Sequence, residues 1–338
     1  MRLTLEQICA VAQGAERIVQ EDDGIRFYRF REEERLVYPA IEHYDNITAA
    51  TAGIQLEFST DATDLYMQVT TKKATNRSFF CHDIFVNDRL VGCLRNYPDG
   101  IGDTNYSHDE FSLGQFSGSY SLGAGNKTVR IVFPWSVVSC LEDLTLKNAT
   151  FITPVKHSKT VLMYGDSITQ GYDSLNPSQS YSLQLARHLD AEAYIKAIGG
   201  EVFRPGLSQV APIHNPDYIT VAYGTNDWNI AKDEETFVEN CNGFLEALSQ
   251  NYPQAKIFVI SPIYRTDTLN PDKSICPFQR IEETIQKAAA PLNNVTFLSG
   301  KDMIPPDALV LADRWIHPNN QGFAHYFENL KNALTPYL

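Results

Sequence analysis

The chain has 338 residues, of which 43% are hydrophobic, and its formal net charge at pH 7 is −13. A chain of this length and apolar content can bury two cores or one unusually large one, so we expect two domains. The negative charge would repel nucleic-acid phosphates, and no block of basic residues offsets it, so we expect no nucleic-acid partner. A neutral or cationic substrate fits this charge better.

The cysteines and the N-terminus bear on redox state and location. Six cysteines are scattered without any C-x-x-C pair, which predicts free thiols and neither a disulfide framework nor a metal-ligand set. The first residues carry an acid early and no apolar stretch of signal-peptide type. No apolar run is long enough for a membrane helix. We therefore expect a cytoplasmic protein without a membrane partner; the oligomeric state is not readable from the sequence.

The first 155 residues are predicted to form a short helical segment and then a β-sandwich. Residues 4–20 follow a helical period, and Thr4 and Gln7 have the spacing of a capping box, so we assign residues 1–24 to a helical segment. In residues 25–155 hydrophobic and polar residues alternate over short runs between turn signals, as in residues 53–61, 64–70 and 128–135. This pattern is typical of an antiparallel sandwich of jelly-roll type. Residues 97–125 are expected to form a long exposed loop.

From about residue 156 the pattern changes to short apolar runs that alternate with amphipathic helices. The runs are residues 161–164, 194–198, 218–223, 257–260 and 295–298. Such alternation is typical of an α/β domain with a parallel sheet, which we place at residues 156–338. Ligands of such sheets bind beyond the carboxyl ends of the strands.

Polar residues stand at or beyond these predicted strand ends. The first run is followed by Ser167, the second by Gly200 and the third by Asn226, while Asp313 and His317 precede the last helix. A histidine can take the proton of a serine hydroxyl, and a carboxylate can orient the imidazole and stabilise its protonated form. The N–H groups of Ser167 and Gly200 and the amide of Asn226 could donate to an oxyanion. The set suits acyl transfer through Ser167.

Each of these motifs also has a simpler interpretation. The Gly-Asp-Ser sequence can be a turn into a helix, with Asp166 as a carboxylate that stabilises the loop. Asn226 can belong to a turn or cap, and His317 can simply begin the last helix. The presence of all of them in order, at successive strand ends of one domain, favours the catalytic interpretation.

The segment from about residue 159 to 338 resembles the SGNH (GDSL) hydrolase family. The matching blocks are GDSITQG with Ser167, IGGEV with Gly200, GTND with Asn226 and IHPN with His317. The resemblance implies a flavodoxin-like three-layer α/β/α fold and hydrolysis of esters, thioesters or amides without a metal or other cofactor. It also implies these four residues as nucleophile, oxyanion donors and base, with Gly199 as the alternative glycine.

One position departs from the family's pattern. The usual last block is D-x-x-H, whereas Arg314 stands three residues before His317 and Asp313 stands four residues before it. A bulged loop would still bring Asp313 to the imidazole. Otherwise a backbone carbonyl would orient the ring, and the site would be a Ser–His dyad.

Three aromatic residues next to these blocks are candidates for the substrate pocket: Tyr172, Trp228 and Trp315. Aromatic faces suit sugar rings, although these residues could equally pack the crevice walls. A β-sandwich ahead of an SGNH domain is similar, in architecture only, to two-domain carbohydrate esterases that remove acetyl groups. We therefore expect a serine esterase that acts on short acyl esters, mainly acetyl, of a small molecule or oligosaccharide.

Three other functions fit parts of the pattern. A lipase-like or thioesterase activity on longer acyl chains would need an apolar groove, and no Leu/Phe-rich lid stretch stands out. A non-catalytic carbohydrate-binding protein would not need every polar residue of the set. A flavodoxin-like phosphate binder would not place Asp166 beside the anion.

Overall fold

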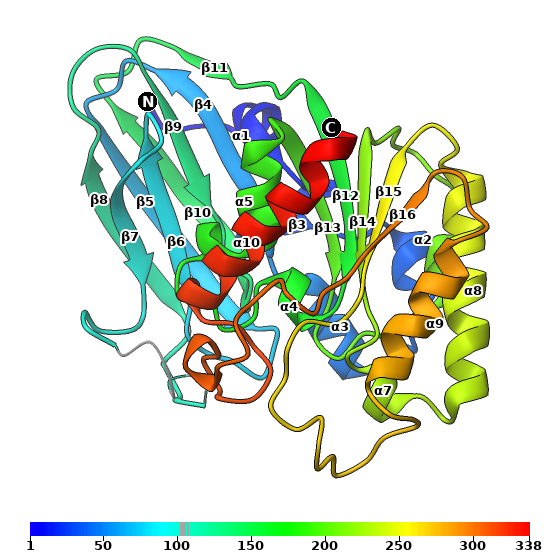
Figure 1. Ribbon diagram of the computed structural model, residues 1–338. Coiled ribbons are helices and arrows are strands. Elements are labelled where there is room, and N and C mark those ends of the chain that lie inside the picture. The colour runs from blue at the N-terminus through cyan, green and yellow to red at the C-terminus, as the bar shows by residue number, and fades with distance from the viewer. Residues whose placement is uncertain (102–105, 107) are drawn as a thin grey trace.

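The computed structural model describes residues 1–338 except 102–105 and 107. Two antiparallel sheets formed before residue 155 pack as a sandwich, and a parallel sheet with helices on both faces follows from Lys159 (Figure 1). We call residues 1–155 the N-terminal half and residues 156–338 the C-terminal half. The fold is therefore a β-sandwich followed by a three-layer α/β/α domain, as the sequence predicts.

The sandwich consists of two antiparallel sheets around an apolar core. One sheet has the order β1 (Ala12–Gln13), β4 (Gln55–Thr60), β9 (Lys127–Val132), β6 (Cys81–Val86) and β7 (Arg89–Arg95), and β11 (Ile152–Pro154) also pairs with β4. The other has the order β2 (Arg17–Glu21), β3 (Gly24–Tyr28), β10 (Val137–Lys147), β5 (Asp64–Lys73) and β8 (Gln115–Ser121). The alternating residues of β4, β5 and β9, such as Leu56, Met67 and Ile131, are fully buried between the sheets, as their period of two predicts.

The helical segment expected at residues 1–24 is wrong beyond its first part. The capping box of Thr4 and Gln7 is present, but α1 covers only Leu5–Val11. Gly14 then takes a φ of +76°, and a Cβ there would lie 2.7 Å from the Gly53 carbonyl oxygen. The chain turns at this glycine because no other residue fits, and Arg17–Glu21 forms β2, which pairs with β3.

The long exposed loop expected at residues 97–125 is also wrong in part. Residues Gln115–Ser121 form β8 and pair with β5 along its length. Tyr97 and Tyr106 are buried against Phe79. Tertiary pairing with β5 outweighs the Gly/Ser-rich composition that suggested a loop. Residues 102–105 and 107 of this stretch lie outside the described residues.

The C-terminal half contains a five-stranded parallel sheet in the order β13, β12, β14, β15, β16. Its strands are β12 (Lys159–Gly165), β13 (Ala191–Ala197), β14 (Tyr218–Ala222), β15 (Lys256–Ile260) and β16 (Val295–Leu298). In chain order this is 2-1-3-4-5, the flavodoxin-like arrangement, whose ligand crevice lies where the strand order reverses beside the first strand. We therefore look for the site at the carboxyl end of β12.

Helices cover both faces of this sheet (Figure 1). On one face lie α5 (Tyr181–His188) and α10 (Asn320–Leu334). On the other lie α6 (Pro205–Ser208), α8 (Glu234–Asn251) and α9 (Gln279–Ala289). Short helices at loops are α4 (Ser167–Gln170), α7 (Asp227–Ile230), η1 (Pro177–Gln179), η2 (Ala308–Val310) and η3 (Thr335–Tyr337). None of the helices among the described residues is both long and apolar enough to cross a membrane.

The two halves are joined by packing and by buried polar contacts. Helices α2 (Glu32–Arg35) and α3 (Glu42–Ala49) belong to the N-terminal half, but Phe30, Tyr38 and Ile47 around them pack into the core beneath α8. The buried Arg29 donates to the carbonyl oxygens of Ile195 and Ala197 on β13. The N-terminal half therefore reaches the loops at the end of the parallel sheet.

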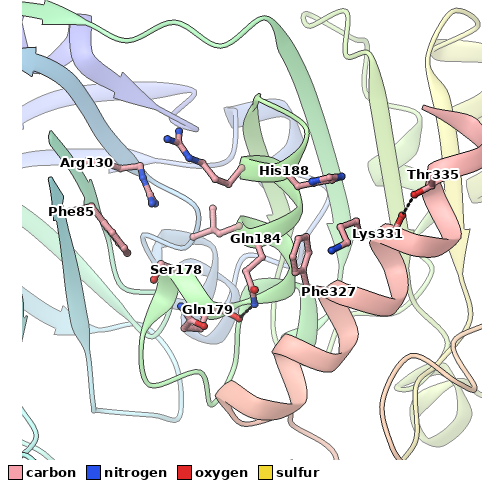
Figure 2. Close-up of a pocket in the computed structure, with 11 residues that line it drawn as sticks. Phe85, Arg130, Ser178, Gln179, Gln184, His188, Phe327, Lys331 and Thr335 are labelled. Carbon is pink, nitrogen blue, oxygen red and sulfur yellow. Dashed lines mark hydrogen bonds between the residues drawn. The ribbon is translucent and has the colours of Figure 1, made fainter. Parts of the chain in front are cut away.

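A second contact region joins the outer face of the sandwich to α5 and α10. It encloses a groove of about 650 Å³, where Phe85 and Arg130 of the sandwich face His188, Phe327 and Lys331 (Figure 2). The groove contains several basic side chains, but Arg187 pairs with Glu57 and Asp88, and Lys331 pairs with Glu328. The pairs of Arg187 with Glu57 and Asp88 join the two halves at a distance from the polar strand ends, whereas the pair of Lys331 with Glu328 lies within α10.

Candidate active site

Three consecutive strand ends and one loop converge on a single cavity. Ser167 follows β12, Gly200 follows β13, Asn226 follows β14, and His317 precedes α10; all four line a cavity of about 470 Å³. The remaining wall comes from α3 and from residues 73–76 at and after the end of β5, both in the N-terminal half. The cavity thus lies at the strand reversal and is closed by the sandwich half.

The turn after β12 presents Ser167 at the first position of α4. A Cβ on Gly165 would lie 2.0 Å from Thr169 Oγ1, so only glycine allows the helix to pack this closely on the strand end. Asp166 caps α4 by accepting from the Ile168 N–H at 2.9 Å. Burial raises the pKa of Asp166 to about 7. Asp166 therefore shapes the loop, as the sequence analysis expected.

Ser167, His317 and Asp313 form a continuous hydrogen-bonded chain. His317 Nε2 lies 2.8 Å from Ser167 Oγ, and His317 Nδ1 lies 2.7 Å from Asp313 Oδ2. A carboxylate that accepts from Nδ1–H leaves the Nε2 lone pair directed at the serine hydroxyl. The geometry is the one needed for a histidine to accept the serine proton.

The extra residue between Asp313 and His317 is accommodated by a left-handed turn. Arg314 has a φ of +59°, and Asp313 Oδ1 accepts from the backbone N–H groups of Trp315, Ile316 and His317 at 2.9, 2.9 and 3.1 Å. Burial acts to raise the pKa of Asp313, but the hydrogen bonds from His317 and these N–H groups outweigh it and hold the pKa well below its usual range. The bulged loop thus delivers a charged carboxylate to the imidazole.

Donors for an oxyanion surround the mouth of the cavity beside Ser167. The Gly199 N–H already donates to Gln170 Oε1 at 2.9 Å. Gly200 has a φ of +79°, and within the described part of the chain no acceptor pairs with its N–H. Asn226 Nδ2 donates one hydrogen to the Glu201 carbonyl oxygen at 2.9 Å, which fixes the amide and leaves its second hydrogen available. This arrangement favours Gly200 over Gly199 as the donor.

Two of the three aromatic residues assigned to the pocket line the cavity. The Tyr172 ring stacks on the His317 imidazole with 5.3 Å between centroids, and Trp315 is half exposed at the rim. The assignment of Trp228 is wrong, because this side chain is buried away from the cavity lining and its Nε1–H donates to the Cys276 carbonyl oxygen. It packs edge-on against Phe278, so the interior of the domain, and not the cavity, takes this large apolar ring.

Several residues of the cavity were missed by the sequence analysis. His43 and Asn46 come from α3, Lys73 ends β5, and Thr75 and Asn76 follow it. None of them lies in a motif, and only the tertiary fold brings residues so distant along the chain to Ser167. No local sequence signal could have identified them.

Two groups of side chains among the described residues are close enough to share a metal ion. They are Cys81, Asp83 and Cys93, and Asp173, Asp313 and His317. In the first, Asp83 accepts from Asn176 and Ser178. In the second, Asp173 is paired with Arg77. Since hydrogen bonds and ion pairs engage the carboxylates of both groups, neither offers a ready ligand set.

The C-terminal half matches a known family. Residues 163–325 match the model of the GDSL-like lipase/acylhydrolase family. This segment includes the ends of β12, β13 and β14 and the loop before α10, which carry Ser167, Gly200, Asn226 and His317. No curated protein sequence matches the chain.

Solved structures of similar fold cover both halves. The salicylyl-acyltransferase SsfX3 from a tetracycline biosynthetic pathway has a TM-score of 0.80 at 18% identity, over 97% of this chain and 95% of that one. A family two carbohydrate esterase from Cellvibrio japonicus has a TM-score of 0.63 at 19% identity, over 99% and 97%. Another, from Clostridium thermocellum in complex with cellohexaose, has a TM-score of 0.63 at 15% identity, over 85% and 93%.

At such identities these structures share the fold with this chain and do not by themselves transfer a substrate. The family match and the motifs that it spans carry the assignment. The C-terminal half thus contains a segment, residues 163–325, that is similar to the GDSL-like lipase/acylhydrolase family, and an ester hydrolase of the SGNH type is the activity that this match supports.

Proposed function

We propose that Ser167, His317 and Asp313 act as a catalytic triad that hydrolyses acetyl and other short acyl esters of carbohydrates. The observation that carries the proposal is the pair of hydrogen bonds from Ser167 Oγ to His317 Nε2 at 2.8 Å and from His317 Nδ1 to Asp313 Oδ2 at 2.7 Å. A serine hydroxyl becomes a nucleophile only when a base is within hydrogen-bond distance.

The reaction would proceed in two acyl-transfer steps. Ser167 Oγ attacks the ester carbonyl carbon while His317 takes its proton, and the imidazolium then gives this proton to the departing alcohol. Water attacks the acyl-serine in the second step with His317 again as base, and the acid is released. Asp313 remains ionised throughout and stabilises the imidazolium.

The tetrahedral intermediates need donors aimed at the oxyanion. We assign this role to the N–H groups of Ser167 and Gly200 and to the Asn226 amide, since all three residues line the cavity. Each such donor typically contributes about 2.7–4 kcal/mol to the stabilisation of the transition state.

The lining of the cavity supports a short acyl group and a polar alcohol. Its aliphatic members are Ile47, Ala74 and Ile316, which form no long apolar channel for a fatty acyl chain. Polar side chains from α3 and the β5 loop and the rings of Tyr172 and Trp315 supply hydrogen bonds and flat faces, as sugar recognition requires. The likeness to family two carbohydrate esterases, one of which holds cellohexaose, fits this substrate class.

The experiment that tests the proposal is hydrolysis of a chromogenic acyl series, from acetate to octanoate, followed by acetylated methyl glycosides. We expect acetate to be cleaved fastest and Ser167→Ala to be inactive. Ser158→Ala, at an exposed serine that bonds to Asp190, is the matched control and should retain full activity. A preference for octanoate would support a lipase-like enzyme instead, and no cleavage at all would support a non-catalytic carbohydrate-binding protein.

A second candidate is transfer of the acyl group to an alcohol other than water. It is favoured by the similarity over nearly the whole chain to a salicylyl-acyltransferase, since an acyl-serine intermediate can react with either acceptor. Adding a sugar acceptor during acetyl ester cleavage tests it. Formation of a new sugar ester at the expense of free acetate would identify a transferase. The cytoplasmic location expected from the sequence remains a prediction.

A further inference from the structure

A second carboxylate lies beside the catalytic imidazole. Asp173 Oδ2 is 3.6 Å from His317 Nδ1, the same nitrogen that bonds to Asp313 Oδ2 at 2.7 Å. The Asp173 side chain is fully buried. Two unbalanced carboxylates at one ring nitrogen would stabilise the imidazolium strongly and keep the base protonated at neutral pH. They would also offer the ring two alternative hydrogen-bond partners.

Arg77 neutralises this second carboxylate. Its Nε and one terminal nitrogen donate to the two oxygens of Asp173 at 2.8 and 3.1 Å, in a two-pronged pair with both side chains almost inaccessible to solvent. Arg77 lies in the segment after β5, in the N-terminal half, and its own N–H donates to Thr75 Oγ1 at 3.1 Å. Thr75 is held in turn by the Ser136 carbonyl oxygen. The sandwich thus fixes the guanidinium that faces Asp173.

The same guanidinium also faces the ring on which His317 stacks. The Arg77 guanidinium carbon lies 5.8 Å from the centroid of Tyr172. Tyr172 stacks on His317 on one side and lies against Trp135, from the N-terminal half, with 4.7 Å between centroids. Asp173 has a φ of +65°, and its carbonyl oxygen accepts from the Tyr106 hydroxyl. The segment after α4 is therefore held from the sandwich side at several points.

We propose that Arg77 is a positioning residue for His317: by neutralising Asp173 it leaves Asp313 as the carboxylate that bonds to the imidazole Nδ1, and so couples the sandwich half to the catalytic base. The proposal rests on the proposed function, since it takes His317 as that base. It gives the N-terminal half a role in the chemistry in addition to closing the pocket.

The charge balance around the imidazole predicts that removing Arg77 and neutralising Asp173 shift the protonation of His317 in opposite directions. The other charged groups near it are Asp313 on its own loop and Asp166 at the start of α4; Arg265 in turn interacts with Asp166 and lies over Trp315. Lys73 and His43 line the same cavity. Removing Arg77 adds one net negative charge to this set, whereas neutralising Asp173 adds one net positive charge.

The test is the pH dependence of kcat/KM between pH 5 and 9 on a chromogenic acetate. Arg77→Met should move the acidic limb of the profile to higher pH by about one unit, and Asp173→Asn should move it to lower pH. The double variant should return the limb close to its wild-type position, because the charges again balance. Arg77→Lys should keep the limb near the wild-type position, since it retains the charge. Arg187→Met, which breaks another ion pair between the halves at Glu57, is the matched control and should leave the limb in place.

A structural role alone would give a different result. If Arg77→Met, Asp173→Asn and the control all lower stability while the limb stays fixed, the proposal is overturned. If Arg77→Met fails to fold, Asp173→Asn still tests the proposal: a shift of the acidic limb to lower pH supports it, and an unchanged limb overturns it. The NMR titration of the His317 ring, assigned by the signal lost in His317→Gln, should show the same opposite shifts without any substrate. If the His317 ring shows these opposite shifts but Ser167→Ala stays active, the proposed triad is refuted. The proposed effect of the Arg77–Asp173 pair on His317 would still stand.

Discussion

The proposed active-site pocket has two walls that differ in how most of their polar side chains are held. The wall from the C-terminal half carries Ser167, His317 and Asn226, and each side chain is fixed by a hydrogen bond of 2.8–2.9 Å. The wall from the N-terminal half carries Asn46, Lys73 and Asn76, whose side chains have no hydrogen-bond or ion-pair partner among the described residues, while its buried Thr75 is held by the Ser136 carbonyl oxygen.

This difference indicates a division of labour. Groups that must meet a transition state are fixed in advance, because catalysis depends on preorganised geometry. Groups that meet only the bound substrate can remain unpaired in water until the substrate arrives. Substitutions in the C-terminal wall should therefore lower kcat, and those in the N-terminal wall should raise KM.

The sharpest test of the C-terminal wall is Asp313→Asn. The amide still accepts from the backbone N–H groups of the bulged loop but presents the wrong charge and a donor to the imidazole, so we expect kcat to fall by about 10⁴-fold. Asp307→Asn is the matched control, because Asp307 also caps a short turn by accepting from the Leu309 N–H. A loss of less than tenfold in kcat on a chromogenic acetate would point to a Ser–His dyad.

The oxyanion donor should give the next largest effect. Asn226→Ala removes an amide that the Glu201 carbonyl oxygen holds toward the cavity, and kcat should fall by roughly 10²–10³-fold with little change in KM. Asn229→Ala, one turn further along α7, removes a similar amide that bonds to the Lys273 carbonyl oxygen. If the two variants have equal kcat, Asn226 does not stabilise the transition state.

The C-terminal wall could be predicted from the sequence because each of its parts is local. A strand followed within four residues by Ser167 or Asn226 places the side chain near the carboxyl edge of the sheet, whichever residues pack around it. Trp228 was misassigned because sequence proximity to Asn226 does not say which way a helical side chain points. The turn that brings Asp313 to His317 requires a left-handed conformation at Arg314. This conformation is uncommon for a residue other than glycine and cannot be predicted from the residue type.

The N-terminal wall could not be predicted, for the opposite reason. Asn46 and Asn76 stand about one hundred residues before Ser167, and nothing in their types separates them from ordinary surface residues. Arg77 and Asp173 likewise become a pair only when the halves pack together. Even the strand β2 was hidden, since the turn at Gly14 depends on the close approach of Gly53.

Asn76→Ala should show the smaller effect expected of the N-terminal wall. Loss of one hydrogen bond to the substrate, about 0.5–1.5 kcal/mol, should raise KM for an acetylated glycoside by roughly twofold to tenfold and leave kcat nearly unchanged. A chromogenic acetate without a sugar should be cleaved as by the wild type. Asn126→Ala, at an exposed turn, is the control. A fall in kcat on both substrates would contradict the proposal that the N-terminal wall affects only substrate binding.

The two halves should also differ in how a histidine responds to acid, with little effect on activity. Burial in the sandwich core lowers the pKa of His82 to about 3 from an ordinary 6.5, so the unfolded chain takes up a proton that the folded chain refuses. The contribution of neutral His82 to the free energy of unfolding is therefore fully present above about pH 6.5. It falls by roughly 1 kcal/mol per pH unit as the pH drops toward 3.

His157, between the halves, should act in the opposite direction. Its hydrogen bond to Glu57, assisted by Asp190, raises its pKa, so its contribution is fully present below about pH 6.5 and is lost as the pH rises through the raised value. In urea denaturation at pH 5, 6, 7 and 8, His82→Gln should flatten the loss of stability in acid, and His157→Gln should steepen it. Equal slopes for both variants and the wild type would mean that neither ring changes its protonation on folding. Opposite changes of slope would show that the contact between the halves stabilises a protonated histidine, whereas the sandwich core excludes one.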